Sequence, residues 1–306
     1  MAILRIMIGL PASGKSTYCS EWHNNGWIVN SSDAIREELY GSEDVQSHND
    51  VIFNTMLRRT LAALAAGVNC IYDATNLVAK RRANLIKEIR RHYPDTRIEA
   101  IVMATPYSEC LKRNLARERH VPTNVILTMM KRFEMPAEWE GFDEIRVYGN
   151  DRPENINKAA EFMTMAEHIP HDNPHHTLTI GYHMQKAYTL YATQEGNFDY
   201  AISQAILWHD ISKPYCKIFT NMHGERTDIA HFYGHANASA YLYLSWLAVA
   251  NINGTLRPID AEIVNLIQYH MIFFDGEKRV ETIKQRYGEK FVEKLKIVHK
   301  YDLLAK

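Results

Sequence analysis

The stretch Gly9-Leu-Pro-Ala-Ser-Gly14-Lys15-Ser16-Thr17 decides how the first half of the chain folds. It follows the apolar run Ile3-Leu-Arg-Ile-Met-Ile8 and matches the pattern G-x-x-x-x-G-K-[ST], which predicts a phosphate-binding loop when a buried strand precedes it and a helix follows. Residues 3–8 are predicted as that strand and residues 16–24 as that helix. The glycines let backbone N–H groups turn inward around phosphate oxygens, and the helix N-terminus adds positive charge. The plainer alternative is a strand-to-helix turn with a surface lysine.

The side chains of this loop have distinct expected roles. Lys15 would contact the β- and γ-phosphates of a nucleoside triphosphate, and the Ser16 hydroxyl would ligate Mg²⁺. The predicted nucleotide-binding residues of the loop are Gly9, Ser13, Gly14, Lys15, Ser16 and Thr17. ATP and Mg²⁺ are therefore the expected cofactors of this part of the chain.

The charge of the chain is balanced overall but uneven along it. The 306 residues suffice for about two domains and carry a formal net charge of -1, which excludes a chain that is basic throughout. Between Asn76 and Arg132, however, 13 Lys or Arg residues stand against 5 Asp or Glu residues. That stretch could bind a polyanion, or it could form solvated helix faces.

The spacing of the cysteines and the hydropathy of the chain indicate the cellular compartment in which the protein works. The four cysteines lie far apart without C-x-x-C spacing, which argues against a disulfide framework and against a cysteine zinc site. No apolar run approaches the ~18 residues of a membrane span, and the strand that follows Met1 leaves no room for a signal peptide. The sequence therefore predicts a cytoplasmic protein without a membrane partner.

The histidines divide the chain into two parts. Of the 15 histidines, 11 follow residue 150, in the half without the phosphate loop, so two different chemistries are expected. A polar stretch that contains Gly149 and Pro153 marks the boundary. The predicted domains are residues 1–148 and 168–306, joined by a linker and a first helix at residues 149–167.

Two acids follow predicted strands of the first domain. The strand at 27–29 precedes Asp33, and the strand at 68–72 is followed directly by Asp73. Ligands of open α/β sheets bind at the C-terminal ends of the strands, so both carboxylates are expected at the ligand edge. There Asp33 could accept the proton of an attacking hydroxyl, Asp73 could assist Mg²⁺, and Arg36 could contact a phosphate. The alternative role for Asp33 is a helix cap.

A pair of arginines follows the predicted strand at 97–103. Arg113 and Arg117 are four residues apart on a helix predicted to begin at Pro106, so they are expected on one face, where they could close over a triphosphate. Glu109 could instead pair with Arg113 on a solvated helix, and the two arrangements are compatible.

Together these motifs resemble the kinase domain of phage-type 5′-polynucleotide kinases over residues 1–148. The segments that carry the resemblance are Gly9 to Ser16, Asn30-Ser-Ser-Asp-x-x-Arg36, Asp73-Ala-Thr-Asn-Leu-x-x-x-Arg-Arg82, Lys112-Arg-Asn-x-x-Arg117 and Val121-Pro-x-x-Val-Ile126. The resemblance implies an α/β P-loop kinase domain, with a parallel sheet covered by helices on both faces. It makes Asp33 the general base on a 5′-hydroxyl, Arg36 a contact on the 3′-phosphate side of the acceptor, and Arg117 a lid residue on the ATP phosphates. Asp73 departs from some relatives, which place the second acid one residue later.

The second domain is predicted to be all-α. Six segments show amphipathic helical periodicity, namely 155–168, 183–195, 198–212, 235–251, 258–272 and 288–305. His209 and Asp210 follow the apolar run 201–208 and precede Pro214, which places the pair at a helix end. Further candidates on separate predicted helices are His183, His235, His270 and Asp302.

This set resembles the HD phosphohydrolase superfamily over residues 168–304. The signature H…HD…D corresponds to His183, His209-Asp210 and Asp302, nitrogen and oxygen ligands that suit Mn²⁺, Ni²⁺ or Co²⁺ better than structural zinc. His235 and His270 could bind a second metal with Asp210 as the bridge, so one and two metals both stay open. Lys213 could bind the phosphate or protonate the leaving oxygen. Five further histidines are expected to be structural or surface residues: His171, His175, His176, His223 and His231.

The two resemblances together imply a bifunctional enzyme that heals broken nucleic-acid ends, with RNA favoured over DNA. One domain would phosphorylate a 5′-hydroxyl, and the other would remove a 2′,3′-cyclic phosphate or a 3′-phosphate. A nucleic-acid ligase could be a further partner. Two alternatives stay open: a small-molecule or nucleoside kinase fused to a nucleotide phosphohydrolase, and a nucleic-acid-binding ATPase with a degenerate HD module.

Overall fold

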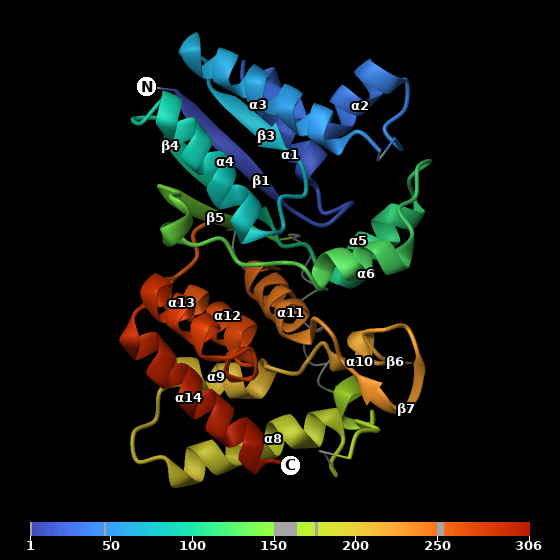
Figure 1. Ribbon diagram of the computed structural model, residues 1–306, viewed down its shortest axis with the longest axis vertical. Helices are drawn as coiled ribbons and strands as arrows, with labels where there is room; N and C mark the ends of the chain where they lie inside the picture. Colours follow the sequence, from blue (N-terminus) through green and yellow to red (C-terminus); the bar gives the residue numbers. More distant parts are fainter. Residues whose placement is uncertain (1, 46, 150–163, 175–176, 250–253) are drawn as a thin grey trace. The chain divides into compact units, whose positions relative to one another are not determined.

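The computed structural model describes residues 2–45, 47–149, 164–174, 177–249 and 254–306 (Figure 1). The chain divides into two compact units. The first unit comprises Met1–Val121, Pro136–Gly149 and Asn251–Thr255, and the second comprises Pro122–Met135, Asn150–Ala250 and Leu256–Lys306. The division does not follow chain order, because the segment Pro122–Met135 belongs to the second unit. The predicted boundary at residues 149–167 stays a prediction, since residues 150–163 lie outside the described part of the chain.

The first unit is built on a five-stranded sheet in which all strand pairs are parallel. Its strands are β1 (Ile3–Gly9), β2 (Ile28–Ser31), β3 (Cys70–Asp73), β4 (Arg97–Met103) and β5 (Glu144–Tyr148), arranged in the order β2-β3-β1-β4-β5. The prediction of a parallel α/β sheet is confirmed. Strand β5 is not predicted from the sequence.

Both faces of this sheet are covered. Met7 of β1 packs with Cys19, Ile71 and Ile101 on the face that meets α1, while its neighbours Ile6 and Ile8 point to the opposite face and are fully buried. In Figure 1, α3 and α4 lie side by side, and the two helices contact each other. The helices of this unit are α1 (Lys15–Asn24), α2 (Ser32–Tyr40), α3 (Asn49–Ala65), α4 (Ala79–His92), α5 (Tyr107–Leu115) and the short η1 (Glu138–Glu140).

The second unit is mostly helical, as predicted. Its helices are α6 (Thr123–Met130), α8 (Ile180–Gln194), α9 (Tyr200–Trp208), α10 (Lys213–Cys216), α11 (His235–Val249), α12 (Pro258–Tyr269), η3 (Ile272–Phe274), α13 (Glu277–Tyr287) and α14 (Glu289–Leu304). The apolar helix α9 contacts α8, α12 and α14, so the C-terminal end of α9 is enclosed. The predicted helix at 155–168 falls largely outside the described residues, of which 164–167 are helical.

One element of the second unit departs from the all-α prediction. Strands β6 (Ile218–Thr220) and β7 (Arg226–His231) form an antiparallel hairpin between α10 and α11. No helix in the described part of the chain is both long enough and apolar enough to span a membrane.

Candidate functional sites

The phosphate loop runs from the end of β1 into α1. A side chain at Gly9 would bring a Cβ within 2.7 Å of Ser13 Oγ and 2.9 Å of the Met103 carbonyl oxygen, so only glycine fits there. Gly14 has φ +101°, which side chains rarely adopt. Lys15 Nζ donates to the carbonyl oxygens of Gly9 (3.0 Å) and Leu10 (2.7 Å), which keeps the ammonium group against the loop. Burial lowers the pKa of Lys15, and the nearby charge of Asp73 opposes this.

Two carboxylates lie at the same sheet edge as this lysine. Strands β2 and β3 are neighbours, and Ser31 is paired with Asp73 across them. Asp73 is buried, which raises its pKa, while the charge of Lys15 lowers it. Asp33 lies in the first turn of α2 with its side chain 52% exposed, and its charge also acts on Lys15. The structure therefore brings Lys15, Asp33 and Asp73 together, with one acid buried and the other open to an acceptor.

The predicted arginines have different environments. Arg36 Nη1 donates to Asp33 Oδ1 at 2.9 Å and Nη2 donates to Asn49 Oδ1 at 2.9 Å, while the Arg36 side chain is only 7% exposed. Arg113 pairs with Glu109 (2.9 Å), and its Nη1 would lie 3.8 Å from a Cβ on Gly14, so it borders the phosphate loop.

The helix predicted to carry both Arg113 and Arg117 is shorter in the structure. Helix α5 ends at Leu115, and Arg117 lies exposed in the turn that follows it. The shared face of Arg113 and Arg117 therefore stays a prediction. Whether Arg117 contacts ATP stays a prediction.

One residue at this edge was not predicted from the sequence. Arg119 Nε lies 2.5 Å from Asp44 Oδ1, its Nη1 2.5 Å from Glu43 Oε2, and its Nη2 donates to the Glu43 carbonyl oxygen at 3.1 Å. Arg119 Nη1 is also 4.0 Å from Asp33 Oδ2. Because these partners lie about 75 residues upstream, no local sequence signal points to Arg119.

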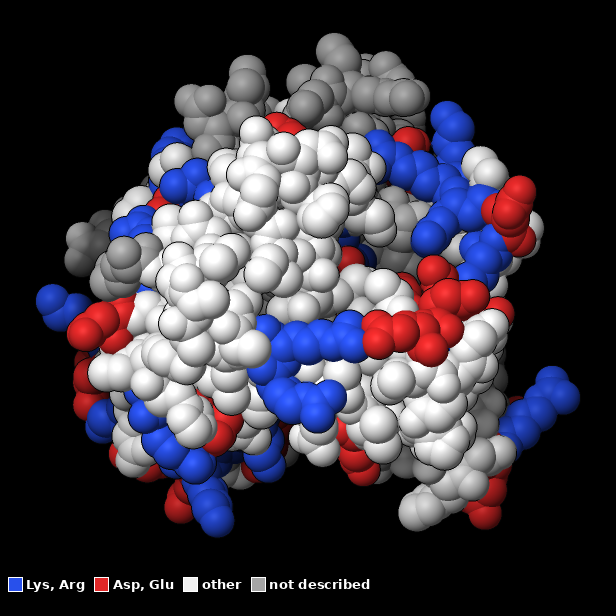
Figure 2. Space-filling model, turned by 90° about the horizontal axis from the view of Figure 1, so that it is seen from above, with Lys and Arg blue, Asp and Glu red and all other residues white. Residues whose placement is uncertain are grey.

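Many cations of the stretch Asn76–Arg132 are paired with carboxylates. Arg82 is fully buried against Glu140, and other pairs join Arg90 to Asp143, Arg97 to Glu99 and Glu144, and Arg113 to Glu109. On the face drawn in Figure 2, basic side chains are interspersed with acidic ones and with a wide uncharged area. The excess of positive charge in the sequence therefore does not amount to an equal excess of unpaired surface charge.

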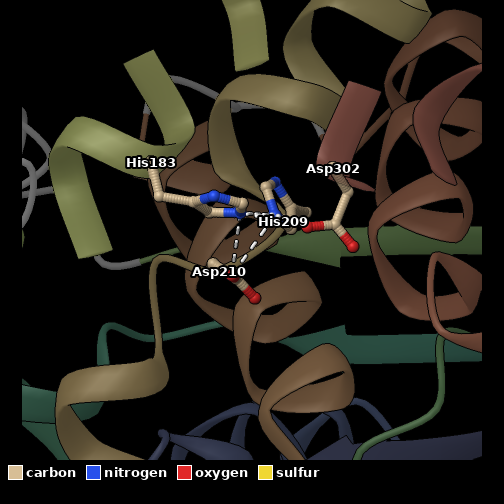
Figure 3. Close-up of side chains that lie close together, drawn as sticks. All are labelled: His183, His209, Asp210 and Asp302. Atoms are coloured by element: carbon tan, nitrogen blue, oxygen red, sulfur yellow. Dashed lines mark hydrogen bonds and ion pairs between the residues drawn. The ribbon is translucent and has the colours of Figure 1, made fainter. Parts of the chain in front are cut away.

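In the second unit, four predicted residues converge from three helices. His183 comes from α8, His209 and Asp210 follow α9 directly, and Asp302 lies near the end of α14. His183 Nε2 lies 3.2 Å from His209 Nε2 and 3.0 Å from Asp302 Oδ1, and His209 Nε2 lies 3.3 Å from Asp210 Oδ2. Figure 3 shows the two imidazoles and the carboxylates directed toward a common point. All four residues are buried and form a group able to hold a metal ion.

A second such group shares Asp210. His235, the first residue of α11, has its Nε2 at 3.2 Å from Asp210 Oδ1, and His270, just after α12, has its Nε2 at 3.8 Å from the same oxygen. The two imidazole nitrogens are 3.2 Å apart. Asp210 thus presents one oxygen to each histidine pair, which is the arrangement of a bridging carboxylate between two cations.

Backbone carbonyl groups define which ring nitrogen of each histidine carries a proton. The Nδ1 atoms of His209, His235 and His270 lie 2.7–2.8 Å from the carbonyl oxygens three residues upstream, and His183 Nδ1 is 3.4 Å from the Ala305 carbonyl oxygen. A carbonyl oxygen only accepts, so each Nδ1 must donate, and in a neutral imidazole the lone pair is then on Nε2. Two neutral Nε2 atoms at 3.2 Å would set lone pair against lone pair, and either a proton on one ring or a metal ion between the rings removes that repulsion. The donor set therefore fits a divalent metal.

The local electrostatics favour positive charge at this point. Burial disfavours the charged imidazole of His209, but the carboxylate of Asp210 outweighs burial and raises the pKa of His209 to about 10. The pKa values of Asp210 and Asp302 are well below their usual range, because neighbouring His209 and His183 oppose the effect of burial. Burial lowers the pKa of His270 to about 3. Ionised carboxylates and neutral imidazoles are the forms that bind a metal, so metal binding at neutral pH would release a proton from His209.

Lys213 and His171 border the metal group. Lys213 Nζ lies 2.5 Å from Asp210 Oδ2 and 3.4 Å from His171 Nε2. His171 is buried, its Nδ1 donates to the Leu178 carbonyl oxygen (2.8 Å), and burial together with Lys213 lowers its pKa to about 4. His171 was expected to have a structural role, but the structure places it beside this site. Its position in the dipeptide His171-Asp172 was the sequence signal that could have identified it.

The other histidines expected to be structural or surface residues lie elsewhere. His175 and His176 lie outside the described residues, while His223 and His231 lie in the hairpin of β6 and β7.

Comparisons with known proteins concern mainly the first unit. A family model described as an AAA domain matches residues 4–136, which end before the helices that carry the histidine cluster. Over 147 residues the chain is 28% identical to the L-seryl-tRNA(Sec) kinase of Methanococcus maripaludis, an alignment that covers 46% of this chain and 56% of that protein. The chain thus spans little more than half the length of this curated relative. A gluconokinase structure from Sinorhizobium meliloti 1021 matches with 18% identity and a TM-score of 0.35, covering 49% of this chain and 84% of that one. These similarities accompany a phosphate loop on a five-stranded parallel sheet in the first unit.

Proposed function

We propose that the protein heals nucleic-acid ends, using the first unit as an ATP-dependent 5′-hydroxyl kinase and the second as a metal-dependent phosphohydrolase of 3′-terminal phosphates. The observation that carries the proposal is the presence, in one chain, of a phosphate loop beside two acids and a buried cluster of four histidines and two aspartates. Each group handles phosphate by different chemistry, and broken RNA ends require both.

The first unit supplies alignment and charge for phosphoryl transfer. Lys15 and Arg113 would lie against the phosphates of ATP, and Ser16 and Asp73 would hold Mg²⁺, which supplies further positive charge when bound. The acceptor hydroxyl oxygen bonds to the γ-phosphorus, the bond to the bridging oxygen of ADP breaks, and Asp33 takes the hydroxyl proton. Arg36 is a positioning residue, because its two terminal nitrogens hold Asp33 and α3 in place.

The second unit supplies a site for hydrolysis. A divalent metal held there would polarise a phosphate oxygen and lower the pKa of a bound water. The residues that would hold it are His183, His209, Asp210 and Asp302, with His235, His270 and Asp210 as a second group. Lys213, whose Nζ contacts Asp210 Oδ2, would bind a phosphate oxygen or give a proton to the leaving oxygen.

The nature of the acceptor is supported by the curated relative. The name of that protein, L-seryl-tRNA(Sec) kinase, describes a kinase of a seryl group carried by a tRNA. A hydroxyl attached to RNA is thus an acceptor for one protein of similar sequence, which favours RNA over a free metabolite for this chain. The half-exposed side chain of Asp33 also leaves room for a large acceptor.

A small-molecule kinase fused to a nucleotide phosphohydrolase is the second candidate. The observation in its favour is the pairing of Arg90, Arg97 and Arg113 with carboxylates, which reduces the positive surface available to a polynucleotide. Competition between a free nucleoside and an oligonucleotide for the labelled phosphate of ATP separates the two candidates.

The test uses RNA with a 5′-hydroxyl and either a 2′,3′-cyclic phosphate or a 3′-phosphate, incubated with ATP, Mg²⁺ and Mn²⁺. Asp33→Asn should lower 5′ phosphorylation roughly 100-fold or more, the contribution of a general base, and leave 3′-end hydrolysis unchanged. Asp210→Asn should do the reverse. The matched controls Asp50→Asn and Asp275→Asn remove exposed carboxylates from the two units. A wild-type protein that forms ADP without phosphorylating any RNA end would contradict the kinase proposal. Full 3′-end hydrolysis by Asp210→Asn would contradict the phosphohydrolase proposal.

A further inference from the structure

The segment that follows α5 is tied to the loop that follows α2 through one guanidinium group. The three guanidinium nitrogens of Arg119 all donate hydrogen bonds: Nε to Asp44 Oδ1, Nη1 to Glu43 Oε2 and Nη2 to the Glu43 carbonyl oxygen. These contacts hold Arg119 beside Asp33, whose Oδ2 is 4.0 Å from Arg119 Nη1. The residue proposed as the general base therefore has two arginines beside it: Arg36 at its Oδ1 and Arg119 nearer its Oδ2.

A ligand can replace the carboxylates of Glu43 and Asp44 as hydrogen-bond acceptors for Arg119. The side chains of Arg119, Glu43 and Asp44 are 30%, 42% and 73% exposed, and ion pairs in such positions contribute little stability. A phosphate group accepts two parallel hydrogen bonds from a guanidinium and so can replace the two carboxylates. Arg36 is less suited to this role, because it is nearly buried and its terminal nitrogens already donate to Asp33 and Asn49.

A cation is needed at this position when the acceptor is a nucleic acid. Asp33 must be ionised to accept the proton, and a phosphate next to the acceptor hydroxyl brings a second negative charge close to it. The two charges repel unless a positive group lies between them. A neutral acceptor would not need this cation.

We propose that Arg119 recognises the phosphate adjacent to the acceptor hydroxyl, and that Glu43 and Asp44 hold its guanidinium until that phosphate replaces them. Arg119 is thus a specificity residue that distinguishes hydroxyl groups next to a phosphodiester from those of neutral molecules. This inference rests on the proposed kinase function and deepens it.

The experiment compares two 5′-hydroxyl oligonucleotides that differ by one charge: one is unmodified, and the other has a neutral methylphosphonate as its first internucleotide linkage. For the wild type we expect kcat/KM to fall at least tenfold with the modified oligonucleotide. For Arg119→Gln we expect a similar loss with the unmodified oligonucleotide, no further loss with the modified one, and an unchanged KM for ATP. Such non-additivity identifies a direct contact between the changed groups. Arg119→Lys should recover part of the loss because it keeps the charge.

Two further variants separate recognition from a purely structural role. Glu43→Gln combined with Asp44→Asn should lower the KM for the unmodified oligonucleotide, because it frees Arg119. Arg59→Gln, which breaks another exposed bidentate pair with Glu38, should behave like the wild type. Independent, multiplicative losses from Arg119→Gln and the methylphosphonate would overturn the proposal, as would a loss in the Glu43/Asp44 variant equal to that of Arg119→Gln.

A binding measurement keeps this test distinct from that of the kinase. Fluorescence anisotropy of the same two oligonucleotides needs no turnover, and the wild type should bind the unmodified one at least tenfold more tightly, a preference that Arg119→Gln should lose. If no oligonucleotide is phosphorylated but this preference is observed, the kinase proposal fails and the recognition by Arg119 stands. Equal binding of both oligonucleotides by the wild type would overturn the role of Arg119.

Discussion

Each clustered imidazole in the second unit is oriented by a backbone carbonyl group, and this detail determines what the cluster can bind. The bonds from Nδ1 leave the Nε2 lone pairs of two histidine pairs directed at the two oxygens of Asp210. Two neutral Nε2 atoms 3.2 Å apart need a proton or a metal ion between them, and each histidine pair has its own oxygen of Asp210. The residues therefore provide two neighbouring cation positions.

At the residue scale, this arrangement makes a prediction about metal content. After dialysis against Mn²⁺, the wild type should hold two ions per chain, one for each group of ligands, as measured by inductively coupled plasma mass spectrometry. His235→Gln should hold one ion, because the group of His183, His209 and Asp302 is complete without it. Asp210→Asn should hold less than one. His223→Gln, an exposed histidine on the hairpin, serves as the control and should hold two; wild-type metal content in His235→Gln would contradict the second position.

The site residues that the sequence predicts are those whose positions follow from local rules. Asp33 and Asp73 follow adjacent parallel strands, so the end of a strand is enough to place them at one edge. The positions of His209 and Asp210 are predicted because an apolar helix ends there, shortly before Pro214. Arg119 could not be predicted, because its position depends on ion pairs with residues about 75 positions away, and nothing in its own neighbourhood distinguishes it from Arg117.

At the scale of elements, one buried ion pair joins α4 to η1. Arg82 donates to both carboxylate oxygens of Glu140 at 2.8 Å, and its Nη1 donates to the carbonyl oxygen of Asn76, in the loop that follows β3. Both side chains are almost completely buried. Of the two arginines that end the motif Asp73 to Arg82, Arg82 is therefore a structural residue that does not face a nucleic acid.

Breaking this pair should destabilise the first unit strongly. Arg82→Leu leaves the charge of Glu140 buried without its partner, so the free energy of unfolding should fall by about 3–5 kcal/mol. In the double variant Arg82→Leu/Glu140→Leu the loss should be much smaller, because no unpaired charge remains. Urea unfolding measures both. Arg91→Leu, which breaks an exposed pair with Glu88, should change stability by less than about 1 kcal/mol, and an additive double variant would contradict this account.

Length and periodicity explain which elements the sequence predicts. Helices α8 and α14 each bury one face and so repeat apolar residues with a helical period, whereas α11 and most of α12 are buried in runs of consecutive residues. Strand β6 has only three residues, and two of them are exposed, so its hairpin leaves no alternating pattern. Helix α5 ends at Leu115 without a glycine or proline to mark its end, which is why Arg117 was placed on it.

At the scale of the whole molecule, the order of the chain and the division into units differ. The family model covers residues 4–136 as one stretch, yet Pro122–Met135 packs within the second unit. Ile126, Met130 and Phe133 are fully buried there, and the ring of Phe133 lies edge-on to Tyr241 of α11 at 5.2 Å. Burial of these three side chains is worth roughly 1.5–3 kcal/mol each, a large fraction of the stability of a domain. The second unit therefore depends on a segment that precedes β5 in the sequence.

Phe133→Ala should consequently destabilise the second unit and leave the first unchanged. We expect a loss of about 3–5 kcal/mol, the usual cost of removing a buried phenylalanine side chain. In calorimetry of the full chain, ATP with Mg²⁺ should raise the transition of the first unit and Mn²⁺ that of the second, because each ligand stabilises the unit that binds it. Phe133→Ala should lower the Mn²⁺-sensitive transition. The matched variant Phe142→Ala removes a buried ring from the first unit and should lower the ATP-sensitive transition instead. If Phe133→Ala lowers the ATP-sensitive transition, the segment stabilises the phosphate-loop unit, and the division of the chain described above is wrong.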